Sequence, residues 1–327
     1  MRQKTILLLL AATLCLTRIA GAETYPDRLI RIVVPTGPGG AADIVSRMIA
    51  DRLQTSLHQT VIVENRPGAN GIVGASYVLS APADGYMMMM GHIGLMTINQ
   101  HIYKDIKFDP LTAFTPVSRA TTYPNVLVVN NKLPVKSVTE LIAYAKKNPN
   151  TLKYSSSGFG GSFHMGMEML KAEANFDAVH VPYTGTALAL SAVVAGDVEM
   201  GFTDAIVAQP QVATNTLRGI AISGQKRSAM LPDLPTVAES GGPGLKNFDV
   251  IGWNGLVVKA GTPPERVKML NEHIQAALNS PDIVARISKL GADVAPGSPE
   301  DFGQFMQAES TKWAALARNA HLAVDNK

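Results

Sequence analysis

The sequence of 327 residues is poor in cysteine, in charge and in long apolar runs. Its one cysteine, Cys15, cannot form an internal disulfide, so a small disulfide-stapled module is excluded. Only 17% of the residues are charged and 46% are hydrophobic, which excludes a disordered chain. No apolar run after residue 22 approaches the ~18 residues of a membrane-spanning helix. What remains is a globular chain long enough for roughly two domains, each with its own core.

The net charge of +3 lies entirely in residues 1–22, which hold three basic residues and no acid. Removing these three from the 29 basic residues leaves 26, which equals the number of acidic residues. An apolar run over residues 6–16 and the small residues Ala20-Gly21-Ala22 complete the pattern of a secretory signal peptide. We expect cleavage after Ala22, which would also remove Cys15. The body is then neutral and thiol-free, with no basic excess that would favour nucleic acid.

The body alternates short β-rich runs with longer helical segments. The pattern predicts a strand over residues 29–35, a glycine loop over 36–40, a helix over 41–57 and a strand over 61–64. A second unit of this kind has a strand over 152–157, a glycine loop over 158–161, a helix over 162–174 and a strand over 178–182. We expect an α/β fold with two lobes, each a mainly parallel sheet flanked by helices.

The later part of the chain is expected to complete the first lobe. It predicts a strand over 250–258 and helices over 264–278, 283–290 and 299–319. The expected lobes are residues 23–121 with 226–327, and residues 122–225. The chain would cross between them near 118–124 and 222–226.

The two glycine loops suggest anion binding. Each precedes a helix, where backbone amides lack intrahelical partners and the helix dipole adds partial positive charge. Two such loops facing each other would clamp a small anion between the lobes. A glycine loop between a strand and a helix is also an ordinary tight turn, so each loop taken alone has that explanation too.

Enzyme, cofactor and metal motifs are missing from the sequence. The loop Gly37-Pro38-Gly39-Gly40 lacks the third glycine of a dinucleotide fingerprint, and neither GxxxxGK[ST] nor G-x-S-x-G is present. Methionines at 87–90 and at 165, 167 and 169 point to different faces of their elements, so core filling explains them better than copper. We therefore expect no catalytic residue, no metal and no cofactor.

Three polar residues near the loops have more than one interpretation. His164, on the helix after the second loop, could act as a base, but a hydrogen bond that orients the loop is favoured. Asp43 complements the dipole of the first helix and could orient the first loop. Asp204 follows a predicted strand and either faces the cleft, where it could meet a cationic part of a ligand, or caps the next helix.

The loop residues resemble those of a known family. The run Pro35-Thr36-Gly37-Pro38-Gly39-Gly40-Ala41-Ala42-Asp43, followed by Arg47, resembles the first-loop signature of the solute-binding proteins of tripartite tricarboxylate transporters, often called the Bug family. Further stretches resemble family positions in the same order along the chain: Asn65-Arg66-Pro67-Gly68-Ala69 with Gly71, Ser155-Ser156-Ser157-Gly158 with His164, His180-Val181-Pro182-Tyr183 with Gly185, Lys226-Arg227, residues 231–241, and Gly261-Thr262-Pro263. The resemblance covers essentially the whole chain after the signal segment.

The resemblance implies a two-lobed periplasmic binding protein that closes around a small carboxylate and delivers it to membrane permease subunits. The candidate ligands are a di- or tricarboxylate, a carboxylic amino acid and an aromatic acid. A periplasmic sensor that signals to a membrane sensor kinase is the alternative function, and an exported hydrolase is a more remote one. We expect a monomer that binds no nucleic acid.

In this family the ligand carboxylate is held by backbone amides, hydroxyl groups and water. The residues implied as ligand-binding are Thr36, Gly37, Pro38, Gly39, Gly40, Asp43, Met96, Thr97, Ser157, Gly158, Phe159, Gly161, Ser162, His164, Thr184, Gly185, Thr186 and Asp204. Thr36 stands where the family often has an aromatic residue and Phe159 where a smaller or polar one is common, so the apolar wall of the pocket would have moved between lobes. Because these loops contain no Arg or Lys, carboxylate binding would depend on neutral donors.

Overall fold

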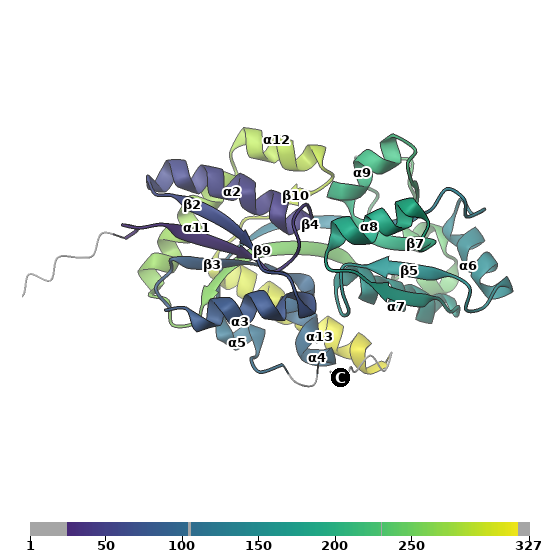
Figure 1. Cartoon of the computed structure of the whole chain (residues 1–327), viewed down its shortest axis with the longest axis horizontal. Helices are drawn as coiled ribbons and strands as arrows, with labels where there is room; N and C mark the ends of the chain where they lie inside the picture. Colours follow the sequence, from purple (N-terminus) through teal and green to yellow (C-terminus); the bar gives the residue numbers. More distant parts are fainter. Residues whose placement is uncertain (1–24, 104–105, 230, 320–327) are drawn as a thin grey trace, which may run out of the picture.

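The molecule is elongated, with a sheet running along its length and helices on both sides (Figure 1). The computed structural model describes residues 25–103, 106–229 and 231–319. The predicted signal peptide, residues 1–22, lies outside the described residues. Within the described ranges, no helix has the length and apolar character needed to cross a bilayer.

The first half of the molecule is built on four neighbouring strands. In spatial order they are β2 (Val61–Asn65), β1 (Ile30–Val34), β3 (Met87–His92) and β9 (Ile251–Lys259). The first three are parallel, and β9 is antiparallel to β3. Helices α2 (Ala41–Leu57), α11 (Pro264–Leu278) and α12 (Pro281–Lys289) pack on one face, and α3 (Ile72–Ser80) and α13 (Pro299–Asn319) pack on the other.

Side chains along these strands alternate between the two faces. Ile32 and Met88 belong to the apolar cluster under α2, whereas Val33 and Met89 belong to the cluster under α3 and α13. All four side chains are fully buried. The run of methionines therefore fills the core on both sides of the sheet, as the period-two pattern predicts.

The second half repeats the arrangement around β7 (Met200–Asp204), β5 (Lys153–Ser156) and β6 (Val179–Pro182), which are parallel neighbours. Helices α6 (Val138–Lys147) and α7 (Ser162–Ala174) pack on one face, and α8 (Thr186–Ala195) and α9 (Ala205–Ala213) pack on the other. The strand β8 (Arg218–Ile222) and the short helix α10 (Val237–Ser240) complete this half.

One long strand, β4 (Phe114–Val129), belongs to both halves. Up to Pro124 it pairs with β9, and from Asn125 it pairs with β7 and β8. The short β10 (Asp293–Val294) pairs with its middle part. The sheet is therefore mixed: parallel strands lie within each half, and antiparallel pairing of β4 and β9 joins them.

The chain crosses between the halves at two adjacent places, along β4 and again between α10 and β9, near Val250. The amide of Ser223 donates to the carbonyl oxygen of Asn125, and the amide of Val250 donates to the carbonyl oxygen of Ser223, each at 2.9 Å. All three residues are fully buried. The predicted lobe boundary at residue 121 lies beside the crossing on β4. The predicted boundary at residue 225 precedes α10, which still packs on the second half. The division into lobes stays a prediction.

Hydrophobic periodicity predicted the long helices well. Helices α2, α7, α11 and α13 begin and end at the predicted residues. The chain between β3 and β4 was not predicted: it forms a π-helical turn, η2 (Gly94–Ile98), followed by the short helices α4 (Asn99–Ile102) and α5 (Pro110–Ala113). This segment determines the position of two predicted site residues.

Candidate ligand-binding site

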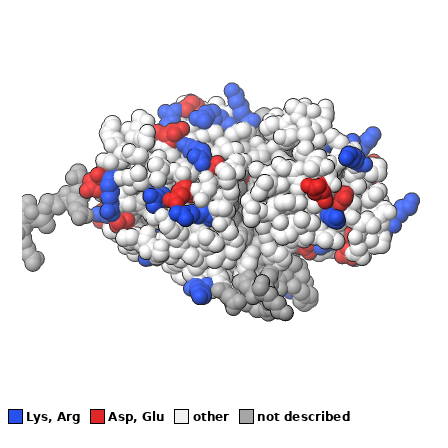
Figure 2. Space-filling model, viewed as in Figure 1, with Lys and Arg blue, Asp and Glu red and all other residues white. Residues whose placement is uncertain are grey.

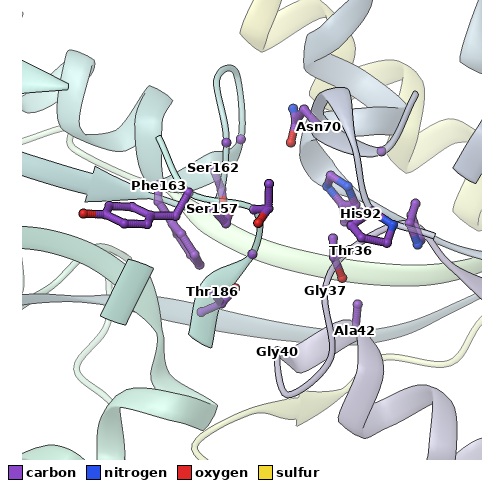
Figure 3. A pocket seen from close by; sticks show the side chains of 18 of the residues that line it. Thr36, Gly37, Gly40, Ala42, Asn70, His92, Ser157, Ser162, Phe163 and Thr186 are labelled. Atoms are coloured by element: carbon purple, nitrogen blue, oxygen red, sulfur yellow. The ribbon is translucent and has the colours of Figure 1, made fainter. Parts of the chain in front are cut away.

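A cavity of about 350 Å³ lies between the two halves, where the loops after β1, β2, β5, β6 and β7 meet. Figure 3 shows the labelled side chains of both halves turned toward a common space. The lining residues are Pro35, Thr36, Gly37, Gly40, Ala41, Ala42, Pro67, Gly68, Ala69, Asn70, Gly71, His92, Ile93, Tyr103, Tyr123, Ser157, Gly158, Phe159, Gly161, Ser162, Phe163, Pro182, Tyr183, Thr184, Gly185, Thr186, Asp204 and Asn254. The position at the carboxyl ends of the strands is the usual one for ligands of α/β sheets.

The halves touch on both sides of this cavity. A Cβ atom placed on Gly37 would lie 2.9 Å from the carbonyl oxygen of Thr184, and one placed on Gly40 would lie 3.3 Å from Oγ1 of Thr186. On the other side, the Tyr103 hydroxyl donates to the carbonyl oxygen of Phe159 at 2.9 Å. The cavity is therefore closed by direct contacts between loops of opposite halves.

The first glycine loop, residues 36–40, is held by a charged network behind it. The carboxylate of Asp43 accepts hydrogen bonds from the amide of Gly39 at 3.0 Å and from the side chain of Asn65 at 3.0 Å. Arg47 donates to both carboxylate oxygens, at 2.8 and 3.2 Å. Burial raises the pKa of Asp43, but these hydrogen bonds outweigh it and the pKa lies below its ordinary value. Asp43 thus positions the loop, as one interpretation predicted, and does not line the cavity.

The second glycine loop, residues 158–161, is held by uncharged rings. Nδ1 of His164 accepts a hydrogen bond from the amide of Gly160 at 3.2 Å. The His164 ring stacks on His180 with centroids 4.2 Å apart, and His180 stacks on Tyr154 at 4.8 Å. Burial lowers the pKa of His164 to about 2 and that of His180 to about 4, so both rings are neutral at physiological pH. The favoured interpretation of His164, a hydrogen bond that orients the loop, is confirmed.

Several loop amides that were predicted to hold an anion already have partners within the protein. Gly39 donates to Asp43, Gly160 to His164, and Gly158 to Oγ of Ser156 at 3.2 Å. These hydrogen bonds hold the loops in shape, so the three amides do not point free N–H groups at a ligand. The expected clamp of free amides is corrected to this extent, because the sequence does not show which side chains fold back onto the loops.

Asp204, at the end of β7, faces the cavity and is only 4% exposed. Its Oδ2 atom accepts a hydrogen bond from the amide of Ala41, at the start of α2 in the opposite half, at 3.4 Å. The hydroxyls of Thr186 and Tyr123 are further hydrogen-bond partners. Burial raises its pKa to about 7. Its side chain makes no capping hydrogen bond to α9, so the helix-cap interpretation is wrong.

Three buried donors in the lining have no hydrogen-bond partner among the described residues: Oγ1 of Thr36, Nε2 of His92 and Nδ2 of Asn254. Nδ1 of His92 accepts from the amide of Leu95 at 3.4 Å, so a neutral ring carries its proton on Nε2. Burial lowers the pKa of His92 to about 4, which keeps the ring neutral. A buried donor costs free energy unless it is paired, so these groups suit a ligand that accepts hydrogen bonds.

The charged side chains lie elsewhere. Figure 2 shows Lys and Arg interspersed with Asp and Glu over both halves, while the groove between the halves is mostly white on this face. Among the described lining residues there is no Lys or Arg. In the described part of the chain, no cluster of three or more His, Cys, Asp or Glu could hold a metal ion.

Most predicted site residues line the cavity, and six do not. Those that do are Thr36, Gly37, Gly40, Ser157, Gly158, Phe159, Gly161, Ser162, Thr184, Gly185, Thr186 and Asp204. Pro38 and Gly39 lie on the exposed side of the first loop, and Asp43 and His164 lie behind the loops.

Met96 and Thr97 are placed by the unpredicted π-helical turn. Both side chains are fully buried, and the Thr97 hydroxyl donates to the carbonyl oxygen of Ile93 at 2.8 Å. The turn directs both residues into the core under α13 and away from the cavity, so the expectation that they line the cleft is corrected.

The sequence analysis did not identify seven lining side chains: Asn70, His92, Ile93, Tyr103, Tyr123, Phe163 and Asn254. Asn70 could have been predicted, because it lies between Ala69 and Gly71 in a stretch that resembles family positions. Its backbone is left-handed, with φ of 47°. It lies against the second loop, where a Cβ on Gly161 would be 3.4 Å from its Oδ1. Tyr123 and Asn254 come from β4 and β9, whose meeting at the cavity floor is a long-range feature of the fold.

Two α/β halves, two adjacent chain crossings and a cavity lined by loops of both halves define the class of two-lobed binding proteins. Comparison with known proteins agrees. The family model described as "Tripartite tricarboxylate transporter family receptor" matches residues 45–322. The chain belongs to this family.

Individual relatives span almost the whole chain. A Pseudomonas sp. (strain P51) protein, called the UPF0065 protein in the tcbD-tcbE intergenic region, is 36% identical over 94% of this chain and 90% of its own length. An R. palustris protein solved with adipate has a TM-score of 0.88 and 34% identity, covering 91% of this chain and 99% of its own. The structure of the periplasmic binding protein BugD has a TM-score of 0.86 and 31% identity, covering 91% of this chain and 99% of its own. MatC from Rhodopseudomonas palustris, with bound malate, has a TM-score of 0.85 and 30% identity, covering 89% of this chain and 99% of its own.

The chain is therefore a periplasmic solute-binding protein of the Bug type, a receptor and not an enzyme. The resemblance read from the loop motifs is confirmed, as is the α/β binding-protein fold.

Proposed function

We propose that this protein binds a small carboxylate in the cavity between its halves and delivers it to the membrane permease subunits of a tripartite tricarboxylate transporter. The observation that carries the proposal is the set of buried, unpaired, uncharged donors on Thr36, His92 and Asn254 in a cavity without Lys or Arg. Relatives bound to adipate and malate support the ligand class. A cavity of about 350 Å³ is suited to a small acid of this kind.

The two halves are proposed to act as lobes that move about the crossings near Asn125 and Val250. The sequence assigned residues 23–121 and 226–327 to one lobe and 122–225 to the other; we propose that α10, which packs on α6, moves with the second lobe. The contacts of Gly37 with Thr184 and of Tyr103 with Phe159 describe the closed form. Opening would separate these pairs and give the ligand access. Export would be accompanied by cleavage after Ala22, which N-terminal sequencing of the secreted protein would test.

The first experiment is a thermal-shift and calorimetric screen against mono-, di- and tricarboxylates, aromatic acids and amino acids. A ligand that binds the native state must raise the unfolding temperature. We expect a stoichiometric complex with at least one carboxylate and no turnover. Conversion of the acid to a product would overturn the proposal.

A variant pair connects binding to the donors. Thr36→Val removes one unpaired hydroxyl at nearly constant volume and should weaken binding roughly 10- to 100-fold, the usual value of a hydrogen bond to a charged group. Thr214→Val, on the exposed end of α9, is the matched control and should bind like the wild type. Delivery is tested by uptake of the bound acid into cells with and without the permease subunits; equal uptake would overturn that part of the proposal.

A further inference from the structure

Asp204 is the one carboxylate side chain among the described residues that line the cavity. It lies between the start of α2 in the first half and Thr186 in the second, through its contacts with the Ala41 amide and the Thr186 hydroxyl. Figure 3 shows Gly40, Ala42 and Thr186 at one end of the pocket and Asn70 and His92 toward the other. The cavity therefore has the carboxylate of Asp204 at one end, with the unpaired Nε2 of His92 away from it; the unpaired Nδ2 of Asn254 is closer to Asp204, because Asn254 contacts Tyr123.

An ionised carboxylate only accepts hydrogen bonds. Its partners here are the Ala41 amide, which donates, and the hydroxyls of Thr186 and Tyr123, of which Tyr123 has its one proton directed to Oδ1 of Asn254. While Asp204 is ionised, a ligand group that approaches it must donate. Toward the other end, Nε2 of His92 donates and so selects an acceptor, and the unpaired hydroxyl of Thr36 lies between the two ends, beside Gly37. A ligand that satisfies both ends carries a carboxylate at one end and a hydrogen-bond donor at the other.

Charge favours the same ligand class. The elements around Asp204 present only uncharged groups to it: the Ala41 amide from α2, Tyr123 from β4, Thr186 from α8 and, beyond Tyr123, Asn254 from β9. Asp43, also on α2, is paired with Arg47. A second ligand carboxylate beside ionised Asp204 would therefore place two like charges together in a buried site, which proteins relieve by protonating one of them.

We propose that Asp204 is a specificity-determining residue: it receives a hydroxyl or amide group of the ligand, so that this protein prefers a monocarboxylate with a terminal donor to the dicarboxylate of equal length, and it binds a dicarboxylate together with one proton. This inference rests on the proposed function and refines its ligand class. Burial raises the pKa of Asp204 to about 7, so its carboxyl can take that proton near neutral pH.

The test uses matched acids: adipate, its monoamide and 6-hydroxyhexanoate, with the succinate series as a shorter set. Calorimetry at pH 8 should show the monoamide or the hydroxy acid of a series binding at least roughly tenfold tighter than the diacid, because like charges juxtaposed at an interface are strongly disfavoured. The difference should narrow at pH 6. Titrations in two buffers of different ionisation enthalpy should show about one proton taken up per dicarboxylate at pH 8.

Asp204→Asn keeps an acceptor and supplies a donor without charge. It should reverse the preference toward the diacid, remove its pH dependence and abolish proton uptake. Asp233→Asn, an exposed acid, is the control for a general change of charge.

The outcomes separate the two proposals. If acids of the panel bind and Asp204→Asn leaves their order and pH dependence unchanged, the role of Asp204 is overturned while the proposed function stands. If no carboxylate binds the wild type, the proposed function fails and this inference with it. Should Asp204→Asn fail to fold, the wild-type protein decides, since dicarboxylate binding at pH 8 without proton uptake overturns the inference.

Discussion

The two glycine loops have the same place in the fold but are held by different chemistry. The first is held by an ion pair, Asp43 with Arg47, and the second by the neutral stack of His164 on His180. In both loops a glycine amide donates a hydrogen bond to a side chain four residues later, on the following helix: Gly39 to Asp43, and Gly160 to His164. The comparison teaches that the repeated sequence pattern specifies where a loop lies, while its mechanical and pH behaviour depends on the partner that each half supplies.

The largest expected effect concerns the contact of the first loop with the opposite half. Gly37→Ala would place a Cβ 2.9 Å from the carbonyl oxygen of Thr184, and backbone cannot rotate away. Closure should be strongly disfavoured and carboxylate affinity should fall about 100-fold, while the unfolding temperature changes little because the Ala lies in the cleft. Gly40→Ala is the matched control: its nearest neighbour is the side-chain oxygen of Thr186 at 3.3 Å, which can turn aside, so a loss of less than about tenfold is expected. Equal affinities for the two variants would contradict the closed geometry.

The second loop can be released by removing its acceptor. His164→Leu leaves the buried amide of Gly160 without a partner, and the free energy of unfolding should fall by about 1–3 kcal/mol. His164→Asn offers a carbonyl oxygen at a similar position and should recover part of this loss. Urea unfolding of the three proteins measures the difference; a Leu variant as stable as the wild type would show that the hydrogen bond does not hold the loop.

The first loop should respond less to the equivalent change. Asp43→Asn retains an oxygen that can accept from Gly39 but loses the charge that attracts Arg47, whose side chain is 53% exposed. We expect the free energy of unfolding to fall by about 1 kcal/mol at low salt, and by less at high salt, where the Asp43–Arg47 attraction of the wild type is screened. Urea unfolding at low and high ionic strength checks both points, and a loss larger than that of His164→Leu would reverse the proposed ranking of the two anchors.

The two loop anchors also differ in their response to pH. His164 and His180 have pKa values lowered by burial, so their contribution is complete above the unfolded pKa of about 6.5 and is lost as pH falls, by up to ~1.4 kcal/mol per pH unit for each ring. The lowered pKa of Asp43 means that the first loop keeps its anchor until pH falls below the ordinary aspartate range. Asp204, with its raised pKa, acts in the opposite sense and adds stability as pH falls from about 7.

The measurement compares how the free energy of unfolding changes with pH in the wild type and in the variants of each anchor. The free energy of unfolding at pH 7 minus that at pH 5 should be smaller for His164→Asn than for the wild type, because the other titrating groups cancel. The same comparison with Asp43→Asn should show no change over this range. A reversed pattern would mean that the charged loop, and not the neutral one, is the acid-sensitive element.

Local patterns were enough to predict the framework of the site. The apolar periodicity of residues 41–57 and 162–174 located the helices, and the glycines before them located the loops. Partners distant in sequence could not be found in this way. The amide of Ala41 meets Asp204, 163 residues later, because β7 and α2 approach each other only in the folded protein. Met96 and Thr97 were expected on a loop that lines the cleft. The chain instead forms a π-helical turn there, which no local pattern marks, and both side chains are buried.

The paired crossings have a mechanical consequence. Asn125, Ser223 and Val250 are joined by short backbone hydrogen bonds within one buried cluster, so the two crossing segments cannot shift independently. In the proposed opening motion, the halves would therefore rotate about this cluster. The contacts of Gly37 with Thr184 and of Tyr103 with Phe159 would then separate together.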